Sequence, residues 1–188
     1  MNIIMTGSTS FVGAATVREL LRRGHTVTAI VRPKSSKLDT ILEGNEEALL
    51  SGRLLVTEND LSEPEKLLEK VTKPQEVFCH FGWGGSGSVS RTDKALQEKN
   101  MEISLETIRT AKALGCKKFL FSGSQAEYGM HQDLITENTV CEPKSLYGEA
   151  KLAMREKGEK LCDELGLRYI HARIFSAYGP GDHPWTLV

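Results

Sequence analysis

Short apolar runs alternate with longer amphipathic segments along the whole chain. Apolar or β-branched runs predict strands, and they cover residues 2–6, 26–31, 53–57, 76–81, 117–122 and 168–175. Apolar positions at helical spacing predict helices, and they cover residues 11–23, 38–50, 62–71, 92–114 and 145–165. Strands that alternate with helices of this length indicate right-handed βαβ units. The pattern predicts an α/β fold with a doubly wound, mostly parallel sheet and helices on both faces.

Local signals refine the helix ends. We expect the 62–71 helix to begin at Ser62, with Pro64 in its first turn. Gly24 and Gly166 follow two of the other helical patterns and predict their ends. Because no linker rich in proline or serine interrupts the alternation, we expect one domain over residues 1–188.

Composition excludes several classes of protein. The 188 residues carry 24 Lys and Arg against 25 Asp and Glu, which argues against a general nucleic-acid binder. No apolar run is long enough for a membrane span, and the first residues lack a secretory signal, so we expect a cytoplasmic protein. The four cysteines are scattered without metal-ligand spacing, and we expect reduced thiols and no metal site.

A glycine-containing turn follows the first strand and precedes the first helix. It reads Thr6-Gly7-Ser8-Thr9-Ser10-Phe11-Val12-Gly13. Glycine here lets the backbone turn sharply and approach a pyrophosphate, whose charge then lies at the helix N-terminus. In this strand–turn–helix context the motif predicts a dinucleotide site in a Rossmann-like fold, and a plain connection is the alternative.

The end of the second strand bears on which dinucleotide binds. Proteins that bind NAD usually carry an acidic residue there for the ribose 2′-hydroxyl, whereas this chain has Arg32. A guanidinium suits a 2′-phosphate, so the sequence favours NADP(H), with NAD(H) possible. A solvated basic loop is the alternative. After the third strand, Asp60 could accept a hydrogen bond from the adenine amino group or simply shape a turn.

Tyr147 and Lys151 are four residues apart on the 145–165 helix and therefore share one face. A cation beside a phenol lowers the pKa of the phenol, which makes Tyr147 a candidate general acid and base. Ser122 and Ser124 lie at the carboxyl end of the fifth strand, where open α/β sheets bind ligands. Ser124 could hydrogen-bond a substrate hydroxyl or carbonyl. The plainer interpretation is that Tyr147 and Lys151 form a pair on the protein surface and that the two serines only shape a turn.

Several motifs together resemble the extended short-chain dehydrogenase/reductases, and more narrowly the NAD-dependent epimerase/dehydratase family that modifies nucleotide sugars. They are Thr6-Gly7-x-x-Ser10-Phe11-x-Gly13, Asp60, His80-Phe81-Gly82, Asn100, Ser122-Gly123-Ser124 with Tyr128-Gly129, Tyr147-x-x-x-Lys151 and Arg173-x-x-Ser176-x-Tyr178-Gly179-Pro180. The resemblance covers essentially the whole chain with the motifs in the right order.

The resemblance implies a role for each matching residue. The expected cofactor-binding residues are Gly7, Ser10, Phe11, Val12, Gly13, Arg32, Asp60, Leu61, Phe81, Gly82, Ser122, Tyr147 and Lys151. Tyr147 would be the acid and base, Ser124 its partner on the substrate, and Lys151 a ligand of the nicotinamide ribose. Asn100 would interrupt its helix and support a proton-relay water together with Lys151.

The resemblance leaves the reaction open. Arg32 favours an NADPH-dependent 4-ketosugar reductase, with an NAD-dependent sugar-nucleotide 4-epimerase as the alternative. A dehydratase is disfavoured, because Gln125-Ala126 stands where those enzymes carry an acidic pair. A non-catalytic dinucleotide-binding module and a truncated, weakly active product are also compatible with these motifs.

Length limits these expectations. In the family, most of the lobe that recognises the nucleotide sugar follows the position at which this sequence ends, so we expect most of that C-terminal substrate lobe to be missing. The resemblance also implies a homodimer built on the 92–114 and 145–165 helices.

Overall fold

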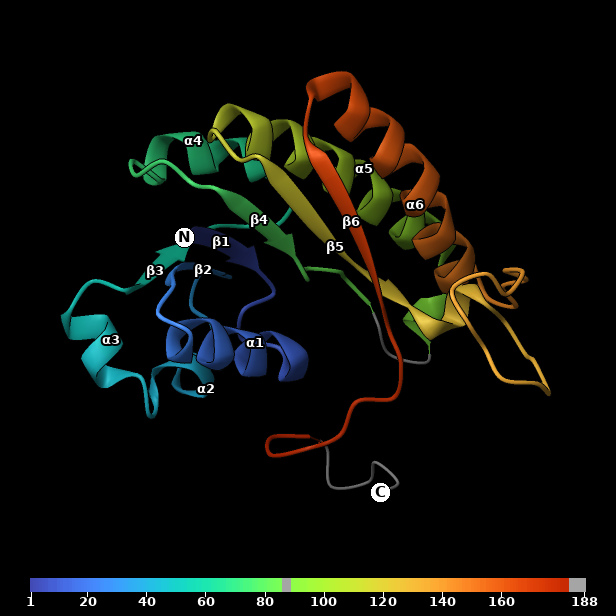
Figure 1. Cartoon of the computed structure of the whole chain (residues 1–188), viewed down its shortest axis with the longest axis horizontal. Helices are drawn as coiled ribbons and strands as arrows, with labels where there is room; N and C mark the ends of the chain where they lie inside the picture. Colours follow the sequence, from blue (N-terminus) through green and yellow to red (C-terminus); the bar gives the residue numbers. More distant parts are fainter. Residues whose placement is uncertain (86–88, 183–188) are drawn as a thin grey trace.

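The computed structural model describes residues 1–85 and 89–182, and in this part of the chain six parallel strands form one sheet (Figure 1). In chain order the strands are β1 (Asn2–Thr6), β2 (Thr26–Val31), β3 (Leu54–Glu58), β4 (Val77–His80), β5 (Lys118–Ser124) and β6 (Arg168–Ile174). Across the sheet their order is β3-β2-β1-β4-β5-β6. The strand order reverses between β1 and β4, which is where open α/β sheets form a ligand crevice.

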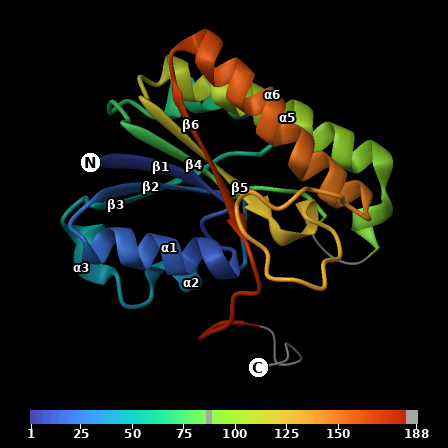
Figure 2. The same ribbon diagram turned by 45° about the vertical axis from the view of Figure 1, so that its right-hand side comes forward.

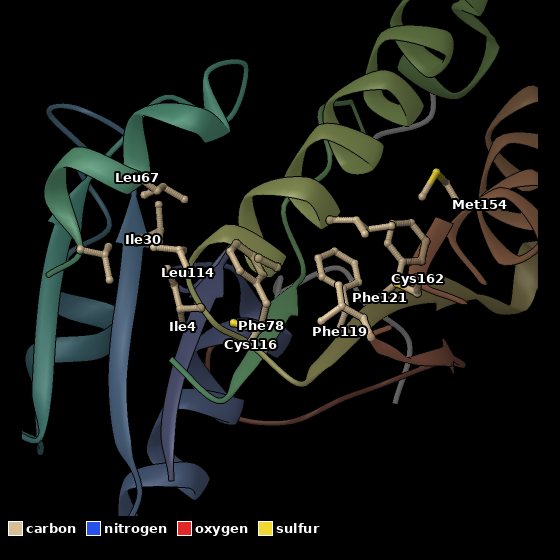
Figure 3. Close-up of a cluster of buried hydrophobic side chains, with 14 residues drawn as sticks. Ile4, Ile30, Leu67, Phe78, Leu114, Cys116, Phe119, Phe121, Met154 and Cys162 are labelled. Carbon is tan, nitrogen blue, oxygen red and sulfur yellow. The ribbon is translucent and has the colours of Figure 1, made fainter. Parts of the chain in front are cut away.

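Helices cover both faces of the sheet, as Figures 1 and 2 show. One face carries α1 (Phe11–Arg22), α2 (Asp39–Leu42) and α3 (Glu46–Leu50), and the other carries α4 (Leu67–Lys70), α5 (Lys94–Ala113) and α6 (Leu146–Leu165). Each face has its own apolar cluster. Figure 3 shows the cluster beneath α5, where the rings of Phe78 and Phe119 stack with centroids 5.6 Å apart. The doubly wound α/β fold predicted from the alternation is confirmed.

Two predicted helices differ from the structure. The 38–50 pattern forms α2 and α3 rather than one helix, because Gly44 between them adopts a left-handed φ of +73°. The 62–71 pattern forms a 3-10 turn, Pro64–Lys66, followed by the single-turn α4. Ser62 does not cap this segment; its hydroxyl and backbone N–H both donate to Asp60 Oδ1.

Strand β5 is longer than its apolar pattern and runs to Ser124. Ser122 and Ser124 therefore lie in the strand itself, where they pair with Ala172 and Ile174 of β6. Among the helices of residues 1–85 and 89–182, none has the length and apolar character needed to cross a membrane. The glycine loop after β4 continues into residues 86–88, and these, like residues 183–188 at the chain's end, lie outside the described residues.

Candidate functional site

The turn after β1 leaves no room for side chains at its glycines. Gly7 has a φ of +69°, and a Cβ there would lie 2.7 Å from the carbonyl carbon of Phe81 and 2.8 Å from the nitrogen of Gly82. A Cβ on Gly13 would collide with the Gly7 carbonyl. Ser10 stands between them and caps α1: its hydroxyl donates to Gly7 O at 2.7 Å and accepts from Gly13 N at 3.1 Å. The Ser10 side chain thus links the two ends of the turn by hydrogen bonds.

A cleft of about 380 Å³ opens beside this turn. The predicted cofactor residues that line it are Gly7, Ser10, Arg32, Asp60, Leu61, Phe81 and Gly82. Phe11 instead lines a neighbouring cavity of about 600 Å³, and Val12 and Gly13 line neither. The cleft also contains Trp83 and Gly84, which sequence reasoning did not assign to a site. Their place in a glycine-rich loop directly after β4 is the one sequence feature that could have assigned them to the cleft.

Two cations lie at one end of the cleft. Arg32 and Lys37 both line it, and Lys37 was not predicted, although it belongs to the same basic loop. Asp60 also lines the cleft, and hydrogen bonds from Ser62 lower the pKa of its carboxyl, with smaller contributions from Lys99 and Arg32. Asp60 therefore shapes a turn, one of its two predicted roles, and its carboxylate borders the cleft.

Lys151 lies at the other end of the site and is only 2% exposed. Its ammonium donates to the Ser122 carbonyl at 2.8 Å and lies 3.9 Å from the ring centroid of Trp83 and 4.6 Å from that of Phe121. Burial lowers the pKa of Lys151 to about 7, against a smaller opposing effect of Glu127. Both protonation states are therefore accessible near neutral pH.

The pKa of Tyr147 differs in direction from the expectation. Burial raises the pKa of the phenol, and hydrogen bonding to Ser124 and the charge of Arg91 oppose this effect only in part. The Arg91 guanidinium lies 4.7 Å from the ring centroid, while the Lys151 ammonium lies 5.7 Å from it and is itself only partly charged near pH 7. The expectation that Lys151 lowers the pKa of Tyr147 is wrong for this arrangement, because desolvation of the ring dominates.

Asn100 was expected to interrupt its helix, but α5 is continuous through it. Its side chain instead binds both backbone groups of Gly84: Oδ1 accepts from Gly84 N at 3.0 Å, and Nδ2 donates to Gly84 O at 2.7 Å. Trp83 is held similarly, since its indole N–H donates to Gln97 Oε1 at 2.9 Å. Two amide side chains of α5 thus fix the loop that forms one wall of the cleft.

A chain of buried hydrogen bonds fixes the start of the same loop. Burial lowers the pKa of His80 to about 3, so the ring is neutral. The Ser104 hydroxyl donates to Asn100 O, so the proton on His80 must lie on Nε2, which donates to Ser104 Oγ. His80 Nδ1 then accepts from the Thr6 hydroxyl, and Thr6 Oγ1 accepts from Gly82 N. The ends of β1 and β4 are joined by this chain to α5.

The predicted catalytic residues are brought together around Trp83. Its ring meets that of Tyr147 edge-on, with centroids 6.2 Å apart, and Lys151 lies over it. Ser124 lies close enough to Tyr147 to lower its pKa through a hydrogen bond. None of these three catalytic candidates lines the cleft directly, so Trp83 connects them to it. In the described part of the chain, no group of three or more His, Cys, Asp or Glu side chains could hold a metal ion.

Known proteins resemble this chain over most of its length. The model of the NAD dependent epimerase/dehydratase family matches residues 3–186. The dTDP-6-deoxy-L-talose 4-dehydrogenase (NAD(+)) of Aggregatibacter actinomycetemcomitans is 30% identical over 173 residues, which cover 90% of this chain and 60% of that protein. The structure of UDP-glucose 4-epimerase from Thermotoga maritima is 26% identical, with a TM-score of 0.81 over 99% of this chain and 59% of the other.

A second solved structure, UDP-N-acetylglucosamine 4-epimerase from Methanobrevibacter ruminantium, is also 26% identical, with a TM-score of 0.80 over 100% of this chain and 59% of the other. The chain therefore spans about 60% of the length of these relatives. The family match extends over nearly all of its residues and includes the turn at Gly7, strand β5 with Ser122 and Ser124, and helix α6 with Tyr147 and Lys151. The chain belongs to the NAD dependent epimerase/dehydratase family.

Proposed function

We propose that residues 1–188 form a domain that holds a nicotinamide dinucleotide in the cleft and supports hydride transfer with a nucleotide sugar. One observation carries this proposal: the cleft runs from the Gly7 turn to Trp83, whose ring contacts both Tyr147 and Lys151. The residues fit the cofactor, because the glycine turn at the start of α1 borders the cleft and two cations, Arg32 and Lys37, line it, as an anionic dinucleotide requires. When bound, the nicotinamide supplies the hydride acceptor or donor.

The chain's own residues supply proton transfer and positioning. Tyr147 exchanges a proton with the substrate oxygen, and the hydroxyl of Ser124 bonds to that oxygen. Lys151, with a pKa of about 7, gives or takes a proton near neutral pH and so can return Tyr147 to its starting state. The backbone of Gly84, fixed by Asn100, keeps the wall of the cleft in place.

Within the proposal, Arg32 and Lys37 favour NADP(H). Two cations at one end of the cleft suit a 2′-phosphate, and a 4-ketosugar reductase consumes NADPH, so we propose that reaction first. An NAD-dependent 4-epimerase is the second candidate, supported by the likeness to 4-epimerases and by the NAD(+) in the name of the Aggregatibacter relative. The resemblance also suggests a homodimer through α5 and α6, which light scattering would test.

Titration of NADPH and NADH against the full chain tests the cofactor proposal. Arg32→Gln should weaken NADPH binding about tenfold, roughly 1.4 kcal/mol, and leave NADH nearly unchanged. Lys34→Gln is the matched control, because Lys34 belongs to the same loop but does not line the cleft. Equal affinities for both dinucleotides, unchanged by Arg32→Gln, would contradict the 2′-phosphate assignment.

Turnover of nucleotide 4-ketosugars and UDP-sugars tests the reaction. Tyr147→Phe should reduce turnover at least a hundredfold while dinucleotide affinity stays within a factor of about three. Turnover that survives in Tyr147→Phe would refute the acid and base assignment. Dinucleotide binding without turnover of any nucleotide sugar would favour the non-catalytic module.

A further inference from the structure

Glu127 is a charged residue without exposed surface near the site, and the proposed chemistry gives it no role. Its side chain is 0% exposed, at the end of the 3-10 turn Gln125–Glu127 that follows β5. A buried carboxylate is costly unless charged and polar groups satisfy it. Glu127 therefore needs partners, and each of them lies close to Ser124 in the fold.

Three donors bind the carboxylate. Oε1 accepts from the backbone N–H of Ser124 at 2.7 Å and from His171 Nε2 at 2.9 Å, and Oε2 accepts from Arg173 Nε at 2.7 Å. His171 and Arg173 belong to β6, and their side chains are 9% and 11% exposed. These hydrogen bonds hold the pKa of Glu127 below its usual range although burial opposes them. The carboxylate is thus ionised and fixed on both oxygens.

The same carboxylate determines how Ser124 is held. Ser124 and Glu127 form a reciprocal cap, in which the Ser124 hydroxyl accepts from Ala126 N at 3.2 Å while Glu127 accepts from Ser124 N. Because the Ser124 oxygen accepts from Ala126, its own proton is the group that remains to donate. Tyr147 lies within reach of that hydroxyl.

Further contacts anchor the cluster from the outside. Arg173 Nη1 donates to Tyr128 Oη at 2.8 Å, and Nη2 donates to Cys141 Sγ at 3.2 Å. On the other side, His171 Nδ1 lies 3.1 Å from the Tyr169 hydroxyl. The position of the carboxylate is therefore determined by β6 and by the segment around residue 141, not by the 3-10 turn alone.

Gly123 makes room for the arrangement. A Cβ on this residue would lie 2.5 Å from His171 Nε2 and 2.7 Å from Glu127 Oε1. Gly123 pairs with Arg173 in the β5–β6 ladder, so the carboxylate and the imidazole approach the strand backbone directly. The cluster is thus built against the strand that carries Ser124.

We propose that Glu127 is a positioning residue: its carboxylate, held by His171 and Arg173, fixes the backbone of Ser124 and so aims the Ser124 hydroxyl at Tyr147. The inference rests on the proposed function only in taking Ser124 and Tyr147 as the pair that meets the substrate. Glu127 itself touches neither the cleft nor the reacting atoms.

The ionisation of Tyr147 provides a readout, because it depends on the Ser124 hydrogen bond as well as on the nearby charges. Arg91 faces the phenol from the 3-10 turn Ser90–Thr92, Lys151 from α6, and Glu127 from the turn after β5. Glu127 raises the pKa of the phenol and Arg91 lowers it. Removing the charge of Glu127 should therefore lower the pKa of Tyr147 directly, whereas loss of the Ser124 hydrogen bond should raise it.

The test uses the full chain with nitrogen-15 and tyrosine ring carbon-13 labels, and NMR of the Ser124 amide and the Tyr147 Cζ. Glu127→Gln should move the Ser124 amide proton upfield, and it should shift the ionisation of Tyr147 by a different amount in a Ser124→Ala background, which has no hydroxyl to position. Glu149→Gln is the matched control, because Glu149 is an exposed carboxylate two residues from Tyr147. It should change neither signal.

Arg173→Gln provides a second variant. It removes one of the groups that hold the Glu127 carboxylate, so it should also move the Ser124 amide signal and should shift Tyr147 ionisation differently with and without the Ser124 hydroxyl, and these results support the proposal even if Glu127→Gln does not fold. If either folded variant leaves the Ser124 amide where the wild type has it, or shifts Tyr147 ionisation equally with and without the Ser124 hydroxyl, the positioning role is refuted. Because neither signal requires turnover, a chain that turns over no nucleotide sugar overturns the proposed function and not this inference.

Discussion

Replacing Lys151 with methionine should stabilise the fold, and should do so more at low pH. The ammonium is 2% exposed, and burial lowers its pKa from 10.5 to about 7. In the unfolded chain the same group keeps its ordinary pKa. The folded state therefore binds this proton less tightly than the unfolded state, which costs stability wherever the proton is bound.

The sign of the pH dependence follows from the two pKa values. Between pH 7 and 10.5 the unfolded chain retains a proton that the folded chain has released, so the free energy of unfolding rises with pH in this window. Below pH 7 both states are protonated and the full cost of burying the cation persists. Above pH 10.5 both are neutral and this cost disappears.

The two pKa values also set the magnitude. They differ by about 3.5 pH units, which corresponds to about 5 kcal/mol of lost stability at low pH. The linkage relation gives a cost between about 4 and 5 kcal/mol at pH 6 and between about 1 and 2 kcal/mol at pH 9.5. Methionine loses the bond to the Ser122 carbonyl and the contact with Trp83, which offset part of the gain. The difference of about 3 kcal/mol between the stability costs at pH 6 and at pH 9.5 is therefore the better quantity to measure.

Urea unfolding of the wild type, Lys151→Met and Lys157→Met at pH 6, 8 and 9.5 measures this change. Lys157 is exposed on the same helix, so its substitution should have the same small effect at every pH. Burial also raises the pKa of other groups, the Cys79 thiol and the Tyr147 phenol among them, but these effects cancel in the difference from the wild type. A gain from Lys151→Met that is equal at pH 6 and 9.5 would refute the argument.

Three further outcomes are expected. Gly7→Ala should abolish dinucleotide binding in calorimetry and destabilise the chain by several kcal/mol more than Gly24→Ala, because both positions have positive φ but only Gly7 lies against neighbouring backbone. Phe119→Ala should cost about 3–5 kcal/mol, lowering Tm by roughly 10 °C in circular dichroism, since its ring is fully buried. Dinucleotide binding should change the tryptophan fluorescence of the wild type, and Trp83→Phe should remove most of that change.

The fold could be predicted because its signals are local. Six short apolar runs became the strands, and the turn at Gly7 lies between a strand and a helix as its motif requires. The spacing of Tyr147 and Lys151 places them on one helical face without tertiary information. The errors were also local: the apolar pattern over 38–50 continued across Gly44, whose left-handed backbone divides the helix.

The electrostatics of the site could not be predicted, because they depend on burial between distant segments. When only their spacing is known, Tyr147 and Lys151 suggest a phenol whose pKa is lowered by a neighbouring cation. In the fold, Trp83 and Phe121 enclose the lysine and lower its pKa, while burial raises that of the tyrosine. Asn100 likewise meets Gly84 across 16 positions of the sequence, and no local pattern marks that pair.

The buried polar residues nevertheless indicate where chemistry is concentrated. An ordinary core buries apolar side chains, and Lys and Glu are almost never fully buried without a partner. Here Lys151 and Glu127 are both buried near the end of β5, together with the neutral ring of His80. The unfavourable burial of Lys151 therefore has a functional consequence. The desolvation that lowers the stability of the fold at pH 6 also brings the lysine pKa to about 7, where a proton can be exchanged. A variant that relieves this cost should gain stability and lose proton exchange together.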